Sequence, residues 1–217
     1  MNKRNIAYIA IDGPIGVGKT SFARAVAKKL SARLILEAAV ENPFLKLFYE
    51  DMKEHAFQTQ IFFLVSRFKQ QQEVLQAELF EQMTVTDYIF QKDQIFAQIT
   101  LSADEYSLYR RLQEILSTRV ACPDVAVYLQ ADIDTLMHRV RSRKIPYENK
   151  ISRPYLETVA EAYERLFFDY DASPLLVVNT NEVNLAKDEA DIDDLIEQLM
   201  RLDSGTQYYI PVRRRGK

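Results

Sequence analysis

The chain has 217 residues, of which 47% are hydrophobic and 27% charged, and its net charge is -3. Such a composition is typical of a globular domain, and the charge gives no basis for an affinity for nucleic acid or anionic lipid. The apolar runs, such as residues 61–65, are far shorter than the ~20 residues that a membrane span needs. The single cysteine, Cys122, excludes an intrachain disulfide and fits a reducing compartment. We therefore expect one domain, residues 1–217, in the cytoplasm.

Apolar runs of strand length alternate with longer stretches of helical period, a pattern typical of a parallel sheet covered by helices. Strands are predicted over residues 5–11, 33–37, a stretch ending near Asp87, 124–130 and 174–180. Helices are predicted over 19–31, in two or three pieces between Pro43 and Phe80 with the clearest at 54–79, over 103–119, from 131 onward, over about 154–170 and over 189–202. The sequence therefore predicts an α/β fold with a five-stranded parallel sheet and helices on both faces.

The first predicted strand runs directly into a glycine-rich stretch that matches G-x-x-x-x-G-K-[ST] in full. A loop of this kind, between a strand and a helix, turns backbone N–H groups toward phosphate oxygens at the positive end of the helix dipole. Lys19 would reach the terminal phosphates, and Thr20 would offer its hydroxyl to Mg²⁺. The predicted nucleotide-binding residues are Gly13, Pro14, Ile15, Gly16, Val17, Gly18, Lys19, Thr20 and Ser21. The loop thus predicts a site for ATP or GTP.

Other stretches indicate what becomes of the phosphate. The N-K-x-D and D-x-x-G stretches of guanine-nucleotide switch proteins are missing from the sequence. The third strand ends in one carboxylate, Asp87, whereas motor ATPases usually carry an adjacent acidic pair there. The stretch "HRVRSRK" places Arg139, Arg141 and Arg143 at a helix end, where cations can close over donor phosphates and stabilise transition-state charge. We therefore expect an arginine-rich lid over about 139–150 and transfer of the phosphoryl group to an acceptor.

Several stretches together resemble the deoxynucleoside kinases, P-loop enzymes that phosphorylate the 5′-hydroxyl of deoxyribonucleosides. They are "LILEAAVENPFL", "LFYEDMKEHAFQTQIFFLVSRF", "RVRSRKIPYEN" and "SRPYLETVAEAYERLF". The likeness covers nearly the whole chain in order, and it is nearest to bacterial members that prefer deoxyadenosine or deoxyguanosine. It implies a P-loop kinase fold, ATP and Mg²⁺ as cofactors, a role in nucleotide salvage, and a homodimer formed through helices such as 54–79 and 103–119.

The resemblance also implies roles for individual residues in substrate binding and catalysis. Glu37, at the end of the second strand, matches the general base, with Glu41 as an alternative. Gln60 matches the amide that pairs with the nucleobase, and Gln58 is the alternative two residues away. Arg67 lies seven residues after Gln60, on the same helix face, and matches a base-side arginine.

Tyr49 and Glu148 match the pair that binds the sugar 3′-hydroxyl in the family. Asp87, at a strand end beside the phosphate loop, is predicted to lie near the substrate and, with Thr20, to hold Mg²⁺. The sequence departs from the family here: many members carry D-R-S or E-R-S, whose arginine holds the 5′-oxygen, but this chain reads "TDYIFQKDQIFA". Lys92 is the nearest cation that could replace that arginine.

Two other functions compete with this interpretation. A nucleoside monophosphate kinase, such as a thymidylate kinase, would need a further cation near residues 37–49, where Lys46 is the only one. A regulatory P-loop protein would bind ATP without depending on a nucleoside. The C-terminal residues 203–217 are predicted to be a tail packed by its tyrosines, with a solvated basic end.

Overall fold

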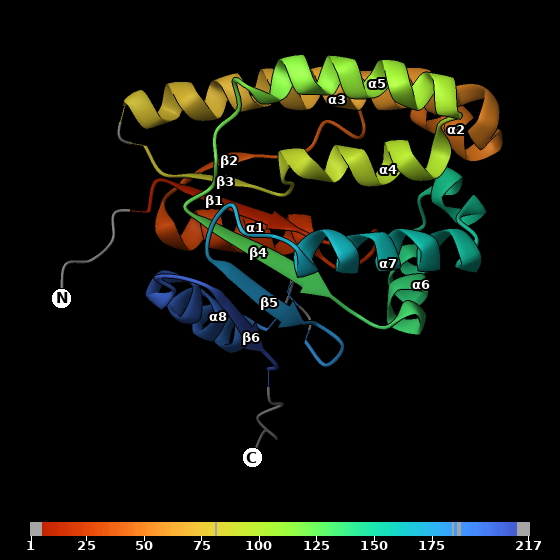
Figure 1. Ribbon diagram of the computed structural model, residues 1–217. Coiled ribbons are helices and arrows are strands. Elements are labelled where there is room, and N and C mark those ends of the chain that lie inside the picture. Colours follow the sequence, from red (N-terminus) through yellow and green to blue (C-terminus); the bar gives the residue numbers. More distant parts are fainter. Residues whose placement is uncertain (1–5, 81, 184, 186–187, 212–217) are drawn as a thin grey trace.

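The computed structural model describes residues 6–80, 82–183, 185 and 188–211. Strands and helices alternate along this part of the chain (Figure 1). The strands are β1 (Tyr8–Asp12), β2 (Arg33–Ile35), β3 (Thr84–Thr86), β4 (Val125–Gln130), β5 (Leu175–Asn179) and β6 (Thr206–Tyr209). The α-helices are α1 (Lys19–Leu30), α2 (Leu45–Glu50), α3 (Met52–Leu79), α4 (Asp93–Thr100), α5 (Ala103–Ser117), α6 (Ile133–Ser142), α7 (Arg153–Phe168) and α8 (Glu189–Arg201). The described residues also include two short 3₁₀ helices, η1 (Phe90–Lys92) and η2 (Pro146–Lys150).

The strands form one sheet in the order β2-β3-β1-β4-β5-β6, and every pair is parallel. Ile9 of β1 pairs with Val85 on one side and with Val125 on the other. The chain therefore turns to opposite sides of β1, and the carboxyl end of β1 is the switch point where parallel α/β sheets bind ligands. The predicted parallel sheet is confirmed, but it has six strands rather than five.

The sixth strand, β6, lies inside the segment 203–217 that was predicted to be a tail. It is an edge strand of four residues whose side chains alternate between exposed and half-buried, so its apolar pattern is too short to predict a strand. Tyr209 packs on the hydrophobic cluster and its Oη donates a hydrogen bond to Asp194 of α8, whereas Tyr208 is 71% exposed, so only one of the two tyrosines packs as expected. The basic residues 212–217 lie outside the described residues.

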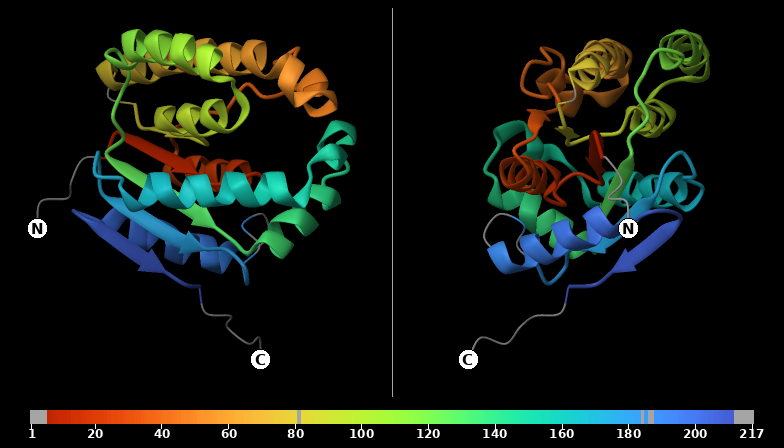
Figure 2. Two further views of the ribbon diagram at one scale, coloured as in Figure 1. Left: turned by 45° about the vertical axis from the view of Figure 1, so that its right-hand side comes forward. Right: turned by 90° about the vertical axis from the view of Figure 1, so that its left-hand side faces the viewer.

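Two hydrophobic clusters fix the helices on the two faces of the sheet (Figure 2). On one face, Phe22 of α1 and Leu195 of α8 share a cluster with alternate strand residues such as Ile9. On the other face, Tyr163 of α7 and Ile95 of α4 pack over the intervening residues of the same strands. This alternation is the period-two pattern expected of strands buried on both sides.

The α3, α4 and α5 helices extend the fold beyond the sheet and pack around Leu64, Phe90 and Tyr109. The predicted helical region from Pro43 to Phe80 is split in two, because Asp51 ends α2 and caps α3 by accepting from the backbone N–H groups of Lys53 and Glu54 at 3.1 Å. Within the described residues, none of the helices combines the length and the apolar character that crossing a membrane would require.

Candidate active site

The phosphate loop joins β1 to α1 in a conformation that needs glycine. Gly13 and Gly18 have φ angles of 150° and 107°, and a Cβ atom on Gly13 would lie 2.2 Å from the Leu129 carbonyl oxygen. Gly18 is the N-cap of α1, so the unpaired N–H groups of that helix open toward the loop. Lys19 Nζ donates to the carbonyl oxygens of Gly13 at 2.7 Å and Pro14 at 3.2 Å. The ammonium group is therefore held over the loop, where phosphate oxygens would lie.

Two of the predicted metal-binding side chains meet at the start of α1. Thr20 Oγ1 donates to Asp87 Oδ2 at 2.5 Å, and Asp87 Oδ1 accepts from the Glu37 backbone N–H at 2.7 Å. A hydroxyl and a carboxylate side by side next to a phosphate site suit Mg²⁺, which prefers oxygen ligands and fills its other positions with water and phosphate. These two residues therefore fit the predicted metal ion.

A pocket opens at the carboxyl edge of the sheet and extends from the phosphate loop to the α2, α3 and α7 helices. It brings together candidates that lie far apart in sequence. The predicted site residues that line it are Ile15, Lys19, Thr20, Glu37, Tyr49, Gln60, Arg67, Asp87, Arg143 and Glu148. A second hollow on the other side of the loop is lined by Gly16, Val17, Gly18, Ser21, Arg139 and Arg143.

A cluster of buried charges occupies the centre of the pocket. Glu37 accepts from Lys92 Nζ at 2.9 Å and pairs with Arg67, which also pairs with Asp93. Lys92 is 2% exposed, and its ammonium lies 3.9 Å from Asp12. Burial alone would raise the pKa of Glu37, but Arg67 and Lys92 outweigh it and hold that pKa well below its usual range. Glu37 is therefore an ionised carboxylate held in one orientation by two cations.

Glu41, the alternative to Glu37, is exposed, and it does not line the pocket. Among the two glutamines, Gln60 is buried and lines the pocket, whereas the Gln58 amide is turned to Glu54 and His55 of its own helix. A helical spacing of two residues points side chains in different directions, so α3 can present only one of them.

The Arg67 guanidinium lies over the ring of Phe63, 4.8 Å from its centroid. Gln60, Phe63 and Arg67 thus form one end of the pocket, with an amide, an aromatic ring and a cation on one face of α3. An amide both donates and accepts hydrogen bonds, and an aromatic ring offers a stacking surface, so this end matches the chemistry of a nucleobase.

The lid segment touches the α2 helix. Tyr147 of η2 stacks on Tyr49 with ring centroids 5.8 Å apart, and Lys150 lies 3.6 Å from Glu50. Glu148 faces the pocket, 3.7 Å from the Arg143 guanidinium. Burial raises the pKa of Glu148, and Arg143 and Lys19 oppose that rise. The predicted lid therefore contacts α2, the helix that carries Tyr49, and its Glu148 faces the pocket.

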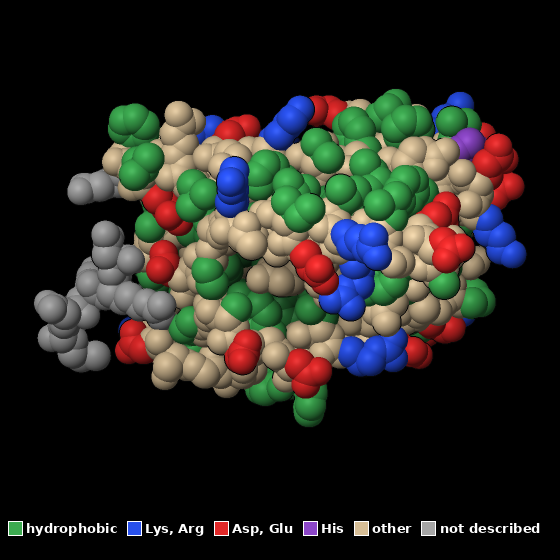
Figure 3. Space-filling view, turned by 45° about the horizontal axis from the view of Figure 1, so that its top comes forward, with side chains coloured by type: hydrophobic (Ala, Val, Ile, Leu, Met, Phe, Trp, Pro, Cys, Tyr) green, Lys and Arg blue, Asp and Glu red, His purple; other side chains and the backbone are tan. Residues whose placement is uncertain are grey.

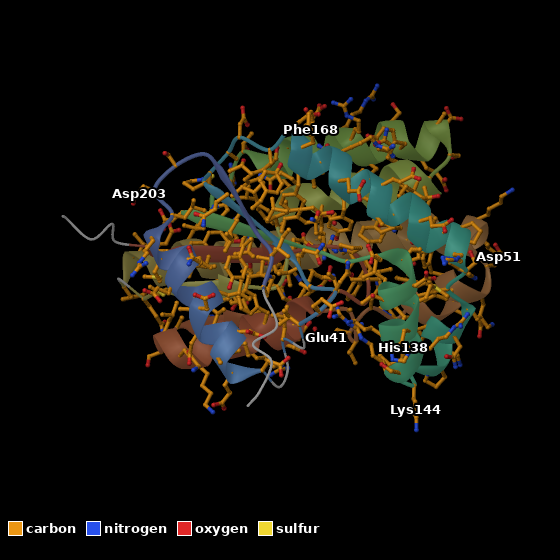
Figure 4. The ribbon with its side chains drawn as sticks, turned by 90° about the horizontal axis from the view of Figure 1, so that it is seen from below. Glu41, Asp51, His138, Lys144, Phe168 and Asp203 are labelled. Carbon is orange, nitrogen blue, oxygen red and sulfur yellow. The ribbon has the colours of Figure 1, made fainter. Side chains whose placement is uncertain are left out.

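The three predicted lid arginines do not share one environment. Arg141 and Arg143 are both exposed, but Arg143 lines the pocket and the neighbouring hollow, and Arg141 lines neither. Arg139 instead donates to the oxygens of Val17, Thr180 and Val183 at distances of 2.5–3.2 Å. Arg139 thus braces the loop after β5 against the phosphate loop, a position that the sequence did not indicate. Further along, the Lys144 side chain points away from the body of the molecule (Figure 4).

Sequence reasoning missed Asp12, the last residue of β1. Its buried carboxylate accepts from the N–H groups of Gly13 at 2.7 Å and Ile89 at 2.9 Å, and from Tyr163 Oη at 3.1 Å. Burial raises the pKa of Asp12, an effect that Lys92 opposes. Asp12 ties the phosphate loop to the segment after β3 and to α7. The sequence carried a weak signal for it, since an acid that ends a buried strand needs partners.

The comparisons with known proteins agree with this geometry. The sequence matches the deoxynucleoside kinase family over residues 9–202. It is 37% identical over 158 residues to a deoxyguanosine kinase of Bacillus subtilis, covering 72% of this chain and 76% of the relative. It is 30% identical over 200 residues to a deoxyadenosine/deoxycytidine kinase of the same organism, covering 89% and 91%.

Among solved structures, the chain is similar to the deoxyadenosine kinase of M. mycoides with bound dATP. The TM-score is 0.74 at 25% identity, over 89% of this chain and 98% of the other. The structure of that kinase with bound dCTP gives a TM-score of 0.73, over 88% and 98%. The family match covers most of the chain, and the protein is therefore a kinase that belongs to the deoxynucleoside kinase family.

Proposed function

We propose that this protein transfers the γ-phosphoryl group of Mg·ATP to the 5′-hydroxyl of a purine deoxyribonucleoside. The observation that carries the proposal is a chain of contacts along one pocket. Thr20 donates to Asp87, Asp87 accepts from the Glu37 backbone, and Glu37 pairs with Arg67, which shares a face of α3 with Gln60. A nucleoside whose base lies against α3 would bring its 5′-hydroxyl between Glu37 and the phosphate loop. The named activities of the relatives, on deoxyguanosine and deoxyadenosine, support the purine preference.

Glu37 would accept the hydrogen bond of the 5′-hydroxyl and take its proton. A carboxylate whose pKa is held so low is a weak base, so it orients the hydroxyl and receives the proton late in the transfer. That timing suits a loose transition state, which needs little activation of the attacking oxygen. Bound Mg²⁺, held through Asp87 and Thr20, would supply charge neutralisation between the phosphates.

Lys92 would take the place of the arginine that the family carries after its strand-end acid. Its ammonium is buried and hydrogen-bonded to Glu37, so it can contact an oxygen atom bound at that carboxylate. Arg143, which lines both hollows, would reach the transferring phosphate from the lid side.

The buried cations of the pocket favour a neutral acceptor over a nucleoside monophosphate. Arg67 is paired with Glu37 and Asp93, and Lys92 is paired with Glu37, so carboxylates already balance the charge of both cations. Lys46 is exposed and does not line the pocket.

The test is ADP formation from Mg·ATP with each deoxynucleoside and each deoxynucleoside monophosphate added singly. We expect turnover with a purine deoxynucleoside and its loss in Lys19→Ala. Turnover with a monophosphate alone would move the chain to the monophosphate kinases, and no stimulation by any acceptor would leave a nucleotide-binding regulator.

The proposal includes a homodimer and a cytoplasmic location. Leu108, Leu112 and Ile115 form an exposed stripe on α5, and hydrophobic side chains gather on the face that includes α3 and α5 (Figure 3). This face supports pairing through the helices that the resemblance implied. Light scattering of the wild type and of Leu112→Glu tests it, and an unchanged dimer in Leu112→Glu would place the interface elsewhere.

A further inference from the structure

Two oxygen atoms in the wall of the pocket are buried and have no hydrogen-bond partner among the described residues. They are the hydroxyl oxygen of Tyr155 and the Oε2 atom of Glu148. The other carboxylate oxygen of Glu148 faces Arg143 at 3.7 Å, so that oxygen has a neighbouring charge. Buried polar groups in folded proteins nearly always have hydrogen-bond partners. Two such atoms without partners in the wall of a pocket indicate that a bound ligand supplies the missing hydrogen bonds.

Tyr155 is held firmly in this position. It lies in the first turn of α7, where its backbone N–H donates to the N-cap hydroxyl of Ser152 at 3.3 Å. Its ring packs against the hydrophobic clusters on both faces of the sheet. A tyrosine anchored in this way has little rotamer freedom, so its hydroxyl is presented to the pocket at low entropic cost.

Tyr155, Glu148 and Tyr49 reach the same corner of the pocket from α7, η2 and α2. Burial raises the pKa of Tyr49, and the nearby Tyr155 and Glu148 add to that rise. None of these three groups is a cation, and the charge of Arg143, 3.7 Å from Glu148, is balanced by that carboxylate, so the corner suits a neutral polar group better than a phosphate. A phenolic hydroxyl can donate, and an ionised carboxylate can only accept. A ligand group that accepts a hydrogen bond from Tyr155 and donates one to Glu148 satisfies both side chains, and an alcohol hydroxyl is such a group.

We infer that Tyr155 is a further substrate-binding residue that, together with Glu148, holds a secondary hydroxyl of the acceptor's sugar. The inference rests on the proposed function and adds a donor that the resemblance did not assign. Tyr155 donates to the sugar oxygen while the sugar hydroxyl donates to Glu148. The sugar is thereby oriented with its 5′-hydroxyl toward Glu37.

The test compares Tyr155→Phe with the wild type on two acceptors, the preferred deoxynucleoside and its 2′,3′-dideoxy analogue, which lacks the secondary hydroxyl. We expect KM for the deoxynucleoside to rise roughly 5- to 20-fold, which is the usual effect of losing one buried hydrogen bond to a ligand. We expect kcat to change less than twofold. With the dideoxy analogue, Tyr155→Phe and the wild type should have the same KM, because the bond is missing from both.

Tyr170→Phe is the matched control, because the Tyr170 hydroxyl bonds Ser173 at 2.9 Å outside the pocket, and its removal should leave both KM values unchanged. An unaltered KM in Tyr155→Phe, or an equal rise on both acceptors, would overturn the role of Tyr155 while leaving the kinase function in place. Failure of the wild type to phosphorylate any nucleoside would instead overturn the proposed function and this inference with it. Thermal unfolding of Tyr155→Phe checks that the variant is folded.

Discussion

The phosphate end and the nucleoside end of the pocket are built in different ways. The phosphate end is one continuous stretch, residues 12–20, in which backbone groups and one helix N-terminus do most of the binding. The nucleoside end is assembled from α2, α3, α4, η2 and α7, and side chains line it. A backbone site depends on the conformation of the main chain and does not tolerate replacement of its glycines, whereas a side-chain site can be altered one residue at a time. The first therefore fixes the cofactor class, and the second can fix the substrate.

Replacing Glu37 should impair phosphoryl transfer, because Glu37 lies between the phosphate end and the nucleoside end of the pocket. In Glu37→Gln the amide cannot accept the proton of the 5′-hydroxyl, and we expect kcat to fall ~10²- to 10⁴-fold while ATP affinity stays within a few fold. Steady-state kinetics and calorimetric titration of ATP measure the two effects. Glu41→Gln is the control, since Glu41 is exposed. Full turnover in Glu37→Gln would remove this carboxylate from the mechanism.

Replacing Lys92 tests whether the nucleoside end depends on its buried cation. We expect Lys92→Met to lower kcat roughly a hundredfold, because it removes a preorganised charge beside the reacting oxygen. Lys92 lowers the pKa of Glu37, so its loss raises that pKa and moves the acid limb of the kcat–pH profile to higher pH. Lys92→Arg should recover part of the rate, and Lys46→Met should behave as the wild type. An unshifted acid limb would contradict the contact between Lys92 and Glu37.

The lid arginines offer a comparison inside one segment. Arg143 lines both hollows and Arg141 lines neither, so Arg143→Met should lower kcat roughly ten- to a hundredfold and Arg141→Met less than threefold. Initial rates at saturating ATP and nucleoside measure both variants. Equal losses would mean that the lid moves far enough on binding to bring Arg141 to the phosphates.

The smallest effect concerns Lys19 at the phosphate end. Burial and the charge of Lys92 lower the pKa of Lys19 to about 8, so above that pH the free protein holds it largely neutral. Phosphate oxygens favour the charged ammonium and raise its pKa, so ATP binding at about pH 8.5 should take up a fraction of a proton. At about pH 6.5, where Lys19 is already charged, this uptake should vanish.

Calorimetry in buffers of different ionisation enthalpy measures the uptake. Lys19→Arg is the control, because a guanidinium stays charged throughout this range. Uptake that persists in Lys19→Arg would assign the proton to another group.

The same contrast explains what the sequence could predict. The phosphate loop is local, since its glycines, lysine and threonine follow one another and each has a physical reason to be there. The sheet and most helices followed from apolar periodicity. The α4 helix was not predicted, because it begins within residues 86–97, which were compared with a family motif and not searched for helical periodicity. The β6 strand was not predicted, because an exposed edge strand has too few apolar residues to show a pattern.

The nucleoside end was predictable only through the resemblance. Gln60 could be preferred over Gln58 once α3 was known to be a helix, because only one face of a helix meets the pocket. The ion pair of Arg67 with Asp93, by contrast, joins α3 to α4 across 26 residues, and no local sequence pattern predicts it. The contacts of Arg139 are another such case: its place in a basic run predicts a role at the phosphates, which stays a prediction, but not its hydrogen bonds to the oxygens of Val17, Thr180 and Val183.

The stack of Tyr147 on Tyr49 joins the lid segment to α2. The ion pair of Lys150 with Glu50 is a second tie between the same two segments. Because two contacts connect η2 with α2, a displacement of the lid segment would also displace the helix that carries Tyr49, so a substitution in one segment can change the geometry of the other.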